Sequence, residues 1–187
     1  FEAVPFEGLK SISDQVKSYG DFEKLMEKVA DWQKKDDVDR KFYLEHLMEP
    51  LLALSAAGSQ KPFLEEYADR QVEEGHLDKA MIAAGYLSLQ DNTIDVFMKV
   101  SENGMAAGRF KDVQRLLSAK TLPKGGWSTS PGEPAQMLEE LKGIFQKMAG
   151  IAKPGELRVF LEKCAASIDA DIKSQLKRDE EFLNPRG

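Results

Sequence analysis

The 187-residue chain has little from which a metal or redox site could be built, because it contains one cysteine and two histidines. The single cysteine, Cys164, excludes a disulfide within the chain and favours a reducing compartment such as the cytoplasm. Together with His46 and His76 it cannot supply the four ligands of a zinc site made of Cys and His alone. We therefore expect no metal and no cofactor. Cys164 stands at helical spacing from Phe160 and Ile168, which predicts a buried, unreactive thiol.

Long apolar runs are also missing. No segment is long enough to span a bilayer, and no signal-peptide pattern is present. Because the sequence begins with Phe1 and not with methionine, we expect that the natural N-terminus is missing, and targeting stays open. A net charge of -6 and a pI near 5.1 count against a nucleic-acid surface, which is usually basic. With 42% hydrophobic and 31% charged residues, the composition is that of a folded, soluble protein.

No motif of catalysis or phosphate binding is found. Gly125 and Gly126 follow no predicted strand and lack the Lys-Ser/Thr of a phosphate loop. The aspartates between Lys35 and Lys41 lack the turn glycine and the closing glutamate of a calcium loop. Adjacent carboxylates such as Glu139 and Glu140 are typical of solvated helix surface. We therefore expect a protein that is not an enzyme.

Apolar residues recur every three or four positions along most of the chain, and no stretch shows the sustained alternation of a half-buried strand. The spacing predicts helices at 6–18, 22–32, 38–57, 62–74, 77–87, 91–106, 109–119, 134–148 and 157–176. Pro50 should kink or divide the third of these. Gly20 is expected to end the first, with Asp21 capping the second, and Asp91 should cap the helix that follows it. The predicted fold class is all-α.

Two short phrases repeat each other along the chain. Residues 75–80 read Gly-His-Leu-Asp-Lys-Ala, and residues 108–113 read Gly-Arg-Phe-Lys-Asp-Val, each between two apolar helices. A looser copy, Gly-Asp-Phe-Glu-Lys-Leu, stands at 20–25. Each phrase predicts the tight corner of a helical hairpin, and a period in the low thirties, as between Gly75 and Gly108, indicates stacked hairpins.

Residues 62–119 resemble two degenerate hairpins of the tetratricopeptide or pentatricopeptide type. In the first copy the matching residues are Leu64, Ala68, Gly75, Leu77 and Ala80. In the second copy Gly108, Phe110 and Leu117 agree, whereas Val113 replaces a small residue and Ser101 stands at the other small position. The characteristic tryptophan and tyrosine are missing from both copies. The stretch from Lys61 to Ala80 is also similar in general sequence character to the α-solenoid segments of vesicle coat and membrane-tethering subunits. This resemblance implies a protein–protein scaffold, with membrane traffic as the favoured process.

The expected architecture is a short α-solenoid of about eight to ten helices in antiparallel hairpins. Residues 1–120 would form the hairpin repeats and residues 121–134 a loop rich in proline and glycine. Residues 135–187 would form a helical pair that packs on the solenoid or continues it. The charged end of this pair, from Asp169 to Glu181, is either an exposed helix or the tail of a truncated array.

The predicted partners are other protein subunits or peptides, without nucleic acid and without membrane insertion. Candidate contact residues are Trp127, Glu66, Arg70 and Lys99. Trp127 either folds back over the end of the 109–119 helix or serves as an exposed anchor, since tryptophan is enriched among interface hot spots. An organellar RNA-binding protein of the pentatricopeptide type is the alternative. Roughly three repeats would read only about three bases, and the acidic pI also counts against it.

Overall fold

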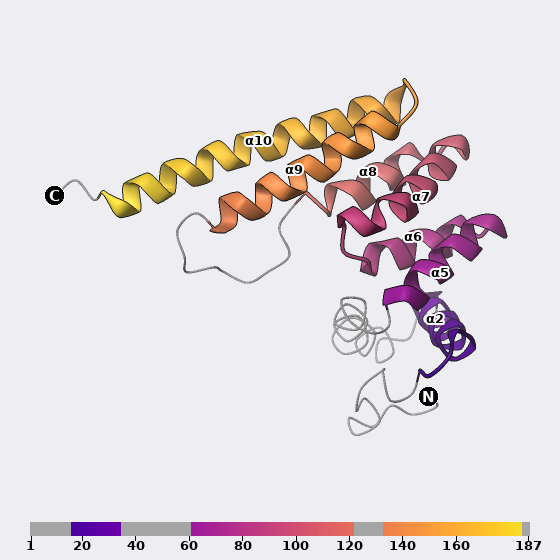
Figure 1. Cartoon of the computed structure of the whole chain (residues 1–187). Coiled ribbons are helices and arrows are strands. Elements are labelled where there is room, and N and C mark those ends of the chain that lie inside the picture. The colour runs from indigo at the N-terminus through magenta and orange to yellow at the C-terminus, as the bar shows by residue number, and fades with distance from the viewer. Residues whose placement is uncertain (1–15, 35–60, 122–132, 185–187) are drawn as a thin grey trace. The chain divides into compact units, whose positions relative to one another are not determined.

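The computed structural model describes residues 16–34, 61–121 and 133–184 (Figure 1). Within these ranges the chain forms seven α-helices and one 3₁₀ turn, and no strand, which confirms the all-α prediction. The predicted helix at 38–57 with Pro50 lies outside the described residues. Contacts within the chain define two compact units, Phe1–Ser88 and Leu89–Gly187. The loop predicted at 121–134 falls inside the second unit.

The first unit contains α2 (Tyr19–Lys34), α5 (Lys61–Glu73) and α6 (Leu77–Tyr86). Helices α5 and α6 pair as a hairpin, and α2 packs against α5. An aromatic cluster joins α2 to α5, because the ring centroid of Phe22 lies 6.1 Å from that of Phe63 and 6.2 Å from that of Tyr67. Phe22 and Tyr67 are fully buried. The contact between these two helices is thus built from large aromatic side chains.

The start of α2 differs from the prediction for Gly20. This glycine lies in the first turn of the helix, and it is not among the glycines with positive φ, so the looser copy at 20–25 forms no glycine corner. Ser18 caps the helix, since its Oγ accepts a hydrogen bond from the Asp21 backbone N–H at 3.3 Å. The Asp21 carboxylate in turn accepts the Lys17 N–H at 3.2 Å, so Asp21 supports the cap from inside the first turn.

The corner between α5 and α6 is formed by Gly75, as predicted. Its φ of 80° lies in the left-handed region, which glycine adopts without a side-chain penalty. The Gly75 N–H donates to the Val72 carbonyl at 3.1 Å, and the His76 N–H donates to the Gln71 carbonyl at 2.8 Å. These two bonds make a Schellman motif, which ends α5 and turns the chain directly into α6.

The second unit contains η3 (Asp91–Thr93), α7 (Ile94–Ala106), α8 (Phe110–Ser118), α9 (Glu133–Ile151) and α10 (Glu156–Leu183). Helices α7 and α8 form one hairpin, α9 and α10 form another, and α7 contacts both helices of the second hairpin. Phe110 of α8 also meets Phe160 of α10 edge-on at 6.2 Å. The two hairpins of this unit therefore pack side by side.

Helix α7 does not begin as the sequence predicts. Asp91 opens the short 3₁₀ turn, and Gln90 is the capping residue before it. The Thr93 hydroxyl accepts a hydrogen bond from the Gln90 backbone N–H at 2.9 Å and donates one to the Gln90 carbonyl oxygen at 3.1 Å. Asp91 instead pairs with Lys147 of α9, with Oδ1 and Nζ 2.6 Å apart. Asp91 therefore helps to join the two hairpins, and it does not cap α7.

The α7–α8 corner at Gly108 repeats the Gly75 corner bond for bond. Gly108 has a φ of 72°, its N–H donates to the Met105 carbonyl at 3.0 Å, and the Arg109 N–H donates to the Gly104 carbonyl at 2.9 Å. Each donor and acceptor holds the same place relative to Gly108 as its counterpart holds relative to Gly75. The shared phrase in the sequence therefore corresponds to one shared backbone geometry.

The pattern of buried residues also repeats between the two hairpins when their glycine corners are aligned. When Gly108 is aligned with Gly75, eight buried positions of the first hairpin fall on buried positions of the second. The first set is Leu64, Tyr67, Ala68, Gln71, Ala80, Ala83, Ala84 and Leu87. The second set is Phe97, Val100, Ser101, Gly104, Val113, Leu116, Leu117 and Lys120. The two hairpins thus bury equivalent faces of equivalent helices.

Helix α10 is the longest element of the described chain, with 28 residues against 19 in α9. Its buried apolar residues run from Leu157 to Ile172, and the charged region beyond them is an exposed helix that continues to Leu183. No helix in the described parts of the chain is both long and apolar enough to cross a membrane.

Candidate functional site

Glu66 and Arg70 lie one turn apart on the exposed side of α5. Arg70 Nη2 is 2.6 Å from Glu66 Oε1, and both side chains remain about half exposed. The guanidinium of Arg70 also stacks on the ring of Tyr19 in α2, 4.3 Å from its centroid. Arg70 is therefore held in place by two contacts, and its cationic group is presented at the surface with little freedom left to lose on binding.

The environment of Tyr19 favours this stacking. Burial raises the pKa of the Tyr19 phenol to about 12, and the negative charge of Glu23 adds to the shift. The phenol therefore stays neutral at physiological pH, and its ring offers a permanent face to the arginine. Residues from α2 and α5 together form the candidate surface in the first unit.

Lys99 of α7 occupies the position equivalent to Glu66 of α5 when the two glycine corners are aligned. Asn103 stands at the position of Arg70, and its Nδ2 donates to the Lys99 carbonyl oxygen at 2.8 Å. The structure therefore places three of the four predicted contact residues on the first helices of the two equivalent hairpins. Trp127, the fourth, lies outside the described residues. Glu66 and Arg70 belong to the first unit and Lys99 to the second.

Another candidate site lies in the second unit, where a groove of about 660 Å³ runs between α9 and α10. Its lining combines small residues with charges of both signs: Lys142, Gln146, Ala149, Gly150, Arg158, Glu162, Ala165, Ala166 and Asp169. The small residues keep the two helices close and leave the groove open. The sequence interpretation did not identify this groove, because its lining comes from two helices whose packing is not encoded in any local motif.

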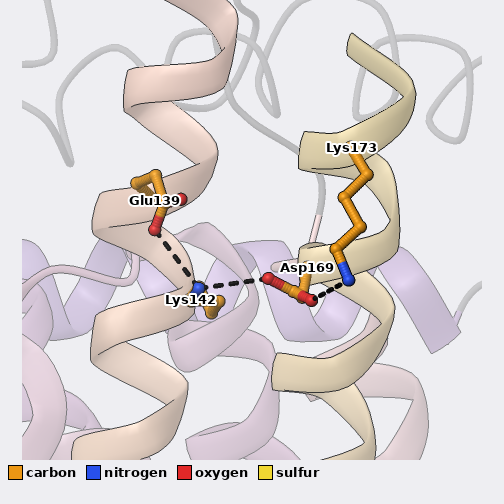
Figure 2. Close-up of polar contacts among 4 residues, drawn as sticks. All are labelled: Glu139, Lys142, Asp169 and Lys173. Atoms are coloured by element: carbon orange, nitrogen blue, oxygen red, sulfur yellow. Dashed lines mark hydrogen bonds and ion pairs between the residues drawn. The ribbon is translucent and has the colours of Figure 1, made fainter. Parts of the chain in front are cut away.

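Charged side chains bridge the groove at one end (Figure 2). Lys142 Nζ lies 3.2 Å from Asp169 Oδ1 and 3.3 Å from Glu139 Oε2. Lys173 Nζ lies 3.2 Å from the other oxygen of Asp169. Asp169 thus receives one lysine from each helix, and this network connects α9 to α10.

These contacts fix the protonation of the bridge. The hydrogen bond from Lys142, followed by that from Lys173, holds the pKa of Asp169 below its usual value. The hydrogen bonds to Asp169 and Glu139 raise the pKa of Lys142. Both groups therefore stay ionised near neutral pH, so Lys142 is not a neutral amine that could attack a substrate. The arrangement suits charge-assisted binding.

Arg158 borders the other end of the groove, near the turn that joins α9 to α10. Its Nε donates to the Ala152 carbonyl oxygen at 2.9 Å, and its Nη2 donates to the same oxygen. The side chain thereby caps the C-terminal end of α9, where a cation is favourable. Because both contacts go to a neutral carbonyl, the positive charge of Arg158 is not neutralised by them.

Cys164 points into the core of the second unit and is only 5% exposed. Burial raises the pKa of its thiol to about 11, so the thiolate is scarce at neutral pH. The prediction of a buried thiol is confirmed. Within the described ranges, no group of three or more His, Cys, Asp and Glu side chains is arranged to hold a metal ion. His46 lies outside these ranges.

His76 shows a contact that spacing did not predict. Its Nδ1 lies 3.0 Å from Oε1 of Gln71, a glutamine on the buried face of α5. The same two residues are also joined by a backbone hydrogen bond. His76 is thus tied to the helix corner, although about half of its side chain is exposed.

The chain matches no family model, no curated protein and no solved structure. Function is therefore inferred from the geometry of the chain itself. The two features that distinguish this geometry are the repeated hairpin, with polar side chains on one side of its first helix, and the groove between α9 and α10.

Proposed function

We propose that this chain is a non-catalytic scaffold of helical repeats that holds other protein subunits within a larger assembly. The observation that carries the proposal is the recurrence of eight buried positions and of one glycine corner in two successive hairpins. Repeated hairpins place equivalent residues at regular intervals, which suits the binding of an extended partner. The tetratricopeptide-like character of residues 62–119 and the solenoid architecture are part of this proposal.

The exposed positions differ between the two copies, whereas the buried ones keep their burial. Glu66 and Arg70 in the first hairpin are replaced by Lys99 and Asn103 in the second. The core of each hairpin thus sets the spacing of its own two helices, and the variable surface sets what that hairpin contacts. Such a division favours a partner with a different charge opposite each repeat, since charged groups in an interface determine specificity.

The resemblance to vesicle coat and membrane-tethering subunits leads us to propose a cytoplasmic membrane-traffic assembly as the setting. Affinity capture with the purified chain, with and without nuclease, tests this. A defined protein set that survives nuclease treatment is expected, and its members would name the assembly. Recovery of specific transcripts, with proteins lost after nuclease treatment, would instead favour the pentatricopeptide-type RNA-binding alternative.

Binding of the purified partner then tests the proposed surface. Lys99→Glu reverses a charge on the first helix of the second hairpin and should weaken binding by about tenfold, since charged interface groups are often worth over ~1 kcal/mol. Lys111→Glu is the matched control, because Lys111 is an exposed lysine on α8 of the same hairpin. Equal affinities for the two variants would contradict the assignment of the first helix as the binding surface.

A further inference from the structure

The C-terminal part of α10 has no partner helix in the hairpin. Helix α10, with 28 residues, is longer than α9, with 19, and the difference corresponds to about 13 Å at roughly 1.5 Å per residue. Figure 1 shows this part extending past the N-terminal end of α9. Leu176 continues the apolar spacing of Ile168 and Ile172, yet it is 49% exposed. Leu176 lies about five helical turns after Arg158, so it falls on the groove side of α10 and is exposed there.

One face of α10 carries both this leucine and the groove. The groove residues Arg158, Glu162 and Asp169 follow one another at helical spacing. The same spacing continues through Lys173 and Leu176 to Glu180. Phe160, which packs on Phe110 of α8, lies on the opposite side of the helix. The face is therefore turned away from α8 and runs nearly the whole length of α10.

The two outermost charges on this face complement each other when the face is paired with its own reversed copy. Arg158 and Glu180 are equally far from Asp169 along the helix, one on each side. If two copies of α10 pair antiparallel about Asp169, Arg158 of each copy lies opposite Glu180 of the other. A parallel pairing would instead bring Arg158 against Arg158 and Glu180 against Glu180. In the described residues neither Glu162 nor Glu180 is engaged in an ion pair.

The same alignment gives Leu176 a place to pack. Glu162 and Leu176 are also equally far from Asp169, so Leu176 of one copy comes level with Glu162 of the other. Helical side chains lean toward the N-terminus of their own helix, which directs Leu176 over Ala165 and Ala166 of the facing copy. The small residues of the groove then receive the leucine. The two Asp169 carboxylates on the symmetry axis keep Lys142 and Lys173 as counter-charges.

We propose that a second copy of this chain docks antiparallel on the α10 face, with Leu176 in the groove of the facing copy and Glu180 on its Arg158. The contact is isologous, so each interaction occurs twice. It involves one helix face, which is less than the area of a standard stable interface, so the dimer is reversible and dissociates on dilution.

Sedimentation equilibrium over a range of chain concentrations measures this dimer. The average mass should rise with concentration from 20.9 kDa toward twice that value. Glu180→Arg and Arg158→Glu should each weaken dimerisation by about tenfold, because each places two like-charged pairs in the interface. An equimolar mixture of the two variants should dimerise again, because in the mixed dimer Arg158 of the first variant meets Glu180 of the second, and the two substituted positions form the other ion pair with exchanged charges. Glu181→Arg, which changes the adjacent residue on another face, should leave dimerisation unchanged.

A second pair of variants avoids Arg158, which also caps α9. Ala166→Trp fills the groove from an exposed position and should abolish dimerisation, whereas Ser167→Trp, at the next exposed position of α10, should not. Thermal melting confirms that each variant is folded. A wild-type chain that stays monomeric at the highest concentration would overturn the proposal. So would a dimer that tolerates Ala166→Trp or is not restored by mixing, because the face would then belong to another partner or another segment.

Discussion

Ala68 and Ser101 occupy the same position in successive helical hairpins, and both side chains are completely buried. Ala68 has no polar atom in its side chain. Ser101 places a hydroxyl in the core, and its Oγ has no hydrogen-bond partner. A buried hydroxyl without a partner costs free energy relative to its solvated state in the unfolded chain. The second hairpin therefore carries a penalty that the first does not.

Replacing Ser101 should relieve this penalty. Ser101→Ala is expected to raise the free energy of unfolding by about 1 kcal/mol, because the hydroxyl is removed and no hydrogen bond is lost. The reverse change at the equivalent position, Ala68→Ser, should lower it by about 1–3 kcal/mol. Chemical denaturation of both variants measures these differences. A destabilised Ser101→Ala variant would mean that the hydroxyl makes a contact that stabilises α7.

The two corner glycines should respond alike to substitution. Gly75→Ala and Gly108→Ala should each cost about 1–2 kcal/mol, since alanine is strained at positive φ. No atom lies within 4 Å of the added Cβ at either glycine, so the cost comes from the backbone alone. Gly85→Ala in α6 is the control and should stabilise by roughly 0.5–1 kcal/mol. Thermal unfolding of the three variants gives the comparison. A loss of stability in only one of the two corner variants would contradict the equivalence of the two corners.

Ala80 tests the packing of the first hairpin. It is fully buried on α6, so Ala80→Phe should lower the free energy of unfolding by about 1–3 kcal/mol through overpacking. Ala170→Phe places the same side chain at an exposed position of α10 and should have little effect. Denaturant unfolding followed by circular dichroism measures the free energy of unfolding of both variants. An Ala80→Phe variant as stable as the wild type would contradict close packing of α6 at this residue.

The Asp169 network predicts a specific dependence on pH. Because the folded pKa of Asp169 is lowered, its ion pairs stabilise the fold above the usual carboxyl pKa of 3.8, and this contribution is lost as the pH falls through the lower, folded value. An NMR titration should place the pKa of the Asp169 carboxyl below 3.8. Lys142→Met and Lys173→Met should each raise it, since each lysine donates a hydrogen bond to this carboxylate. An unchanged pKa in either variant would contradict the contacts drawn in Figure 2.

The features that could be predicted from the sequence have local causes. A glycine between two apolar helices indicates a left-handed corner, and Gly75 and Gly108 confirm this. Apolar spacing likewise identified the buried face of α10 as far as Ile172 and the burial of Cys164. Each of these depends on residues within about one or two helical turns of one another, where spacing alone determines which side chains share a face.

Other features depend on packing or on competing caps, so local spacing could not supply them. Gly20 resembles the other corner glycines in sequence, but Ser18 caps a helix that already includes it. Leu176 follows Ile168 and Ile172 at helical spacing, yet it lies on the groove side of α10 and is 49% exposed. The Lys142–Asp169 pair joins residues far apart in the sequence and exists because α9 and α10 pack together. The groove has the same origin.

The affinity of the captured partner for the Lys99→Glu and Lys111→Glu variants tests whether the first helices of the hairpins form the binding surface. If the chain is a scaffold that binds through the first helices of its hairpins, Lys99→Glu should bind about tenfold more weakly than the wild type, and Lys111→Glu should bind as the wild type does. Binding that is unchanged in Lys99→Glu and lost in Lys111→Glu would show that the partner does not bind through these first helices.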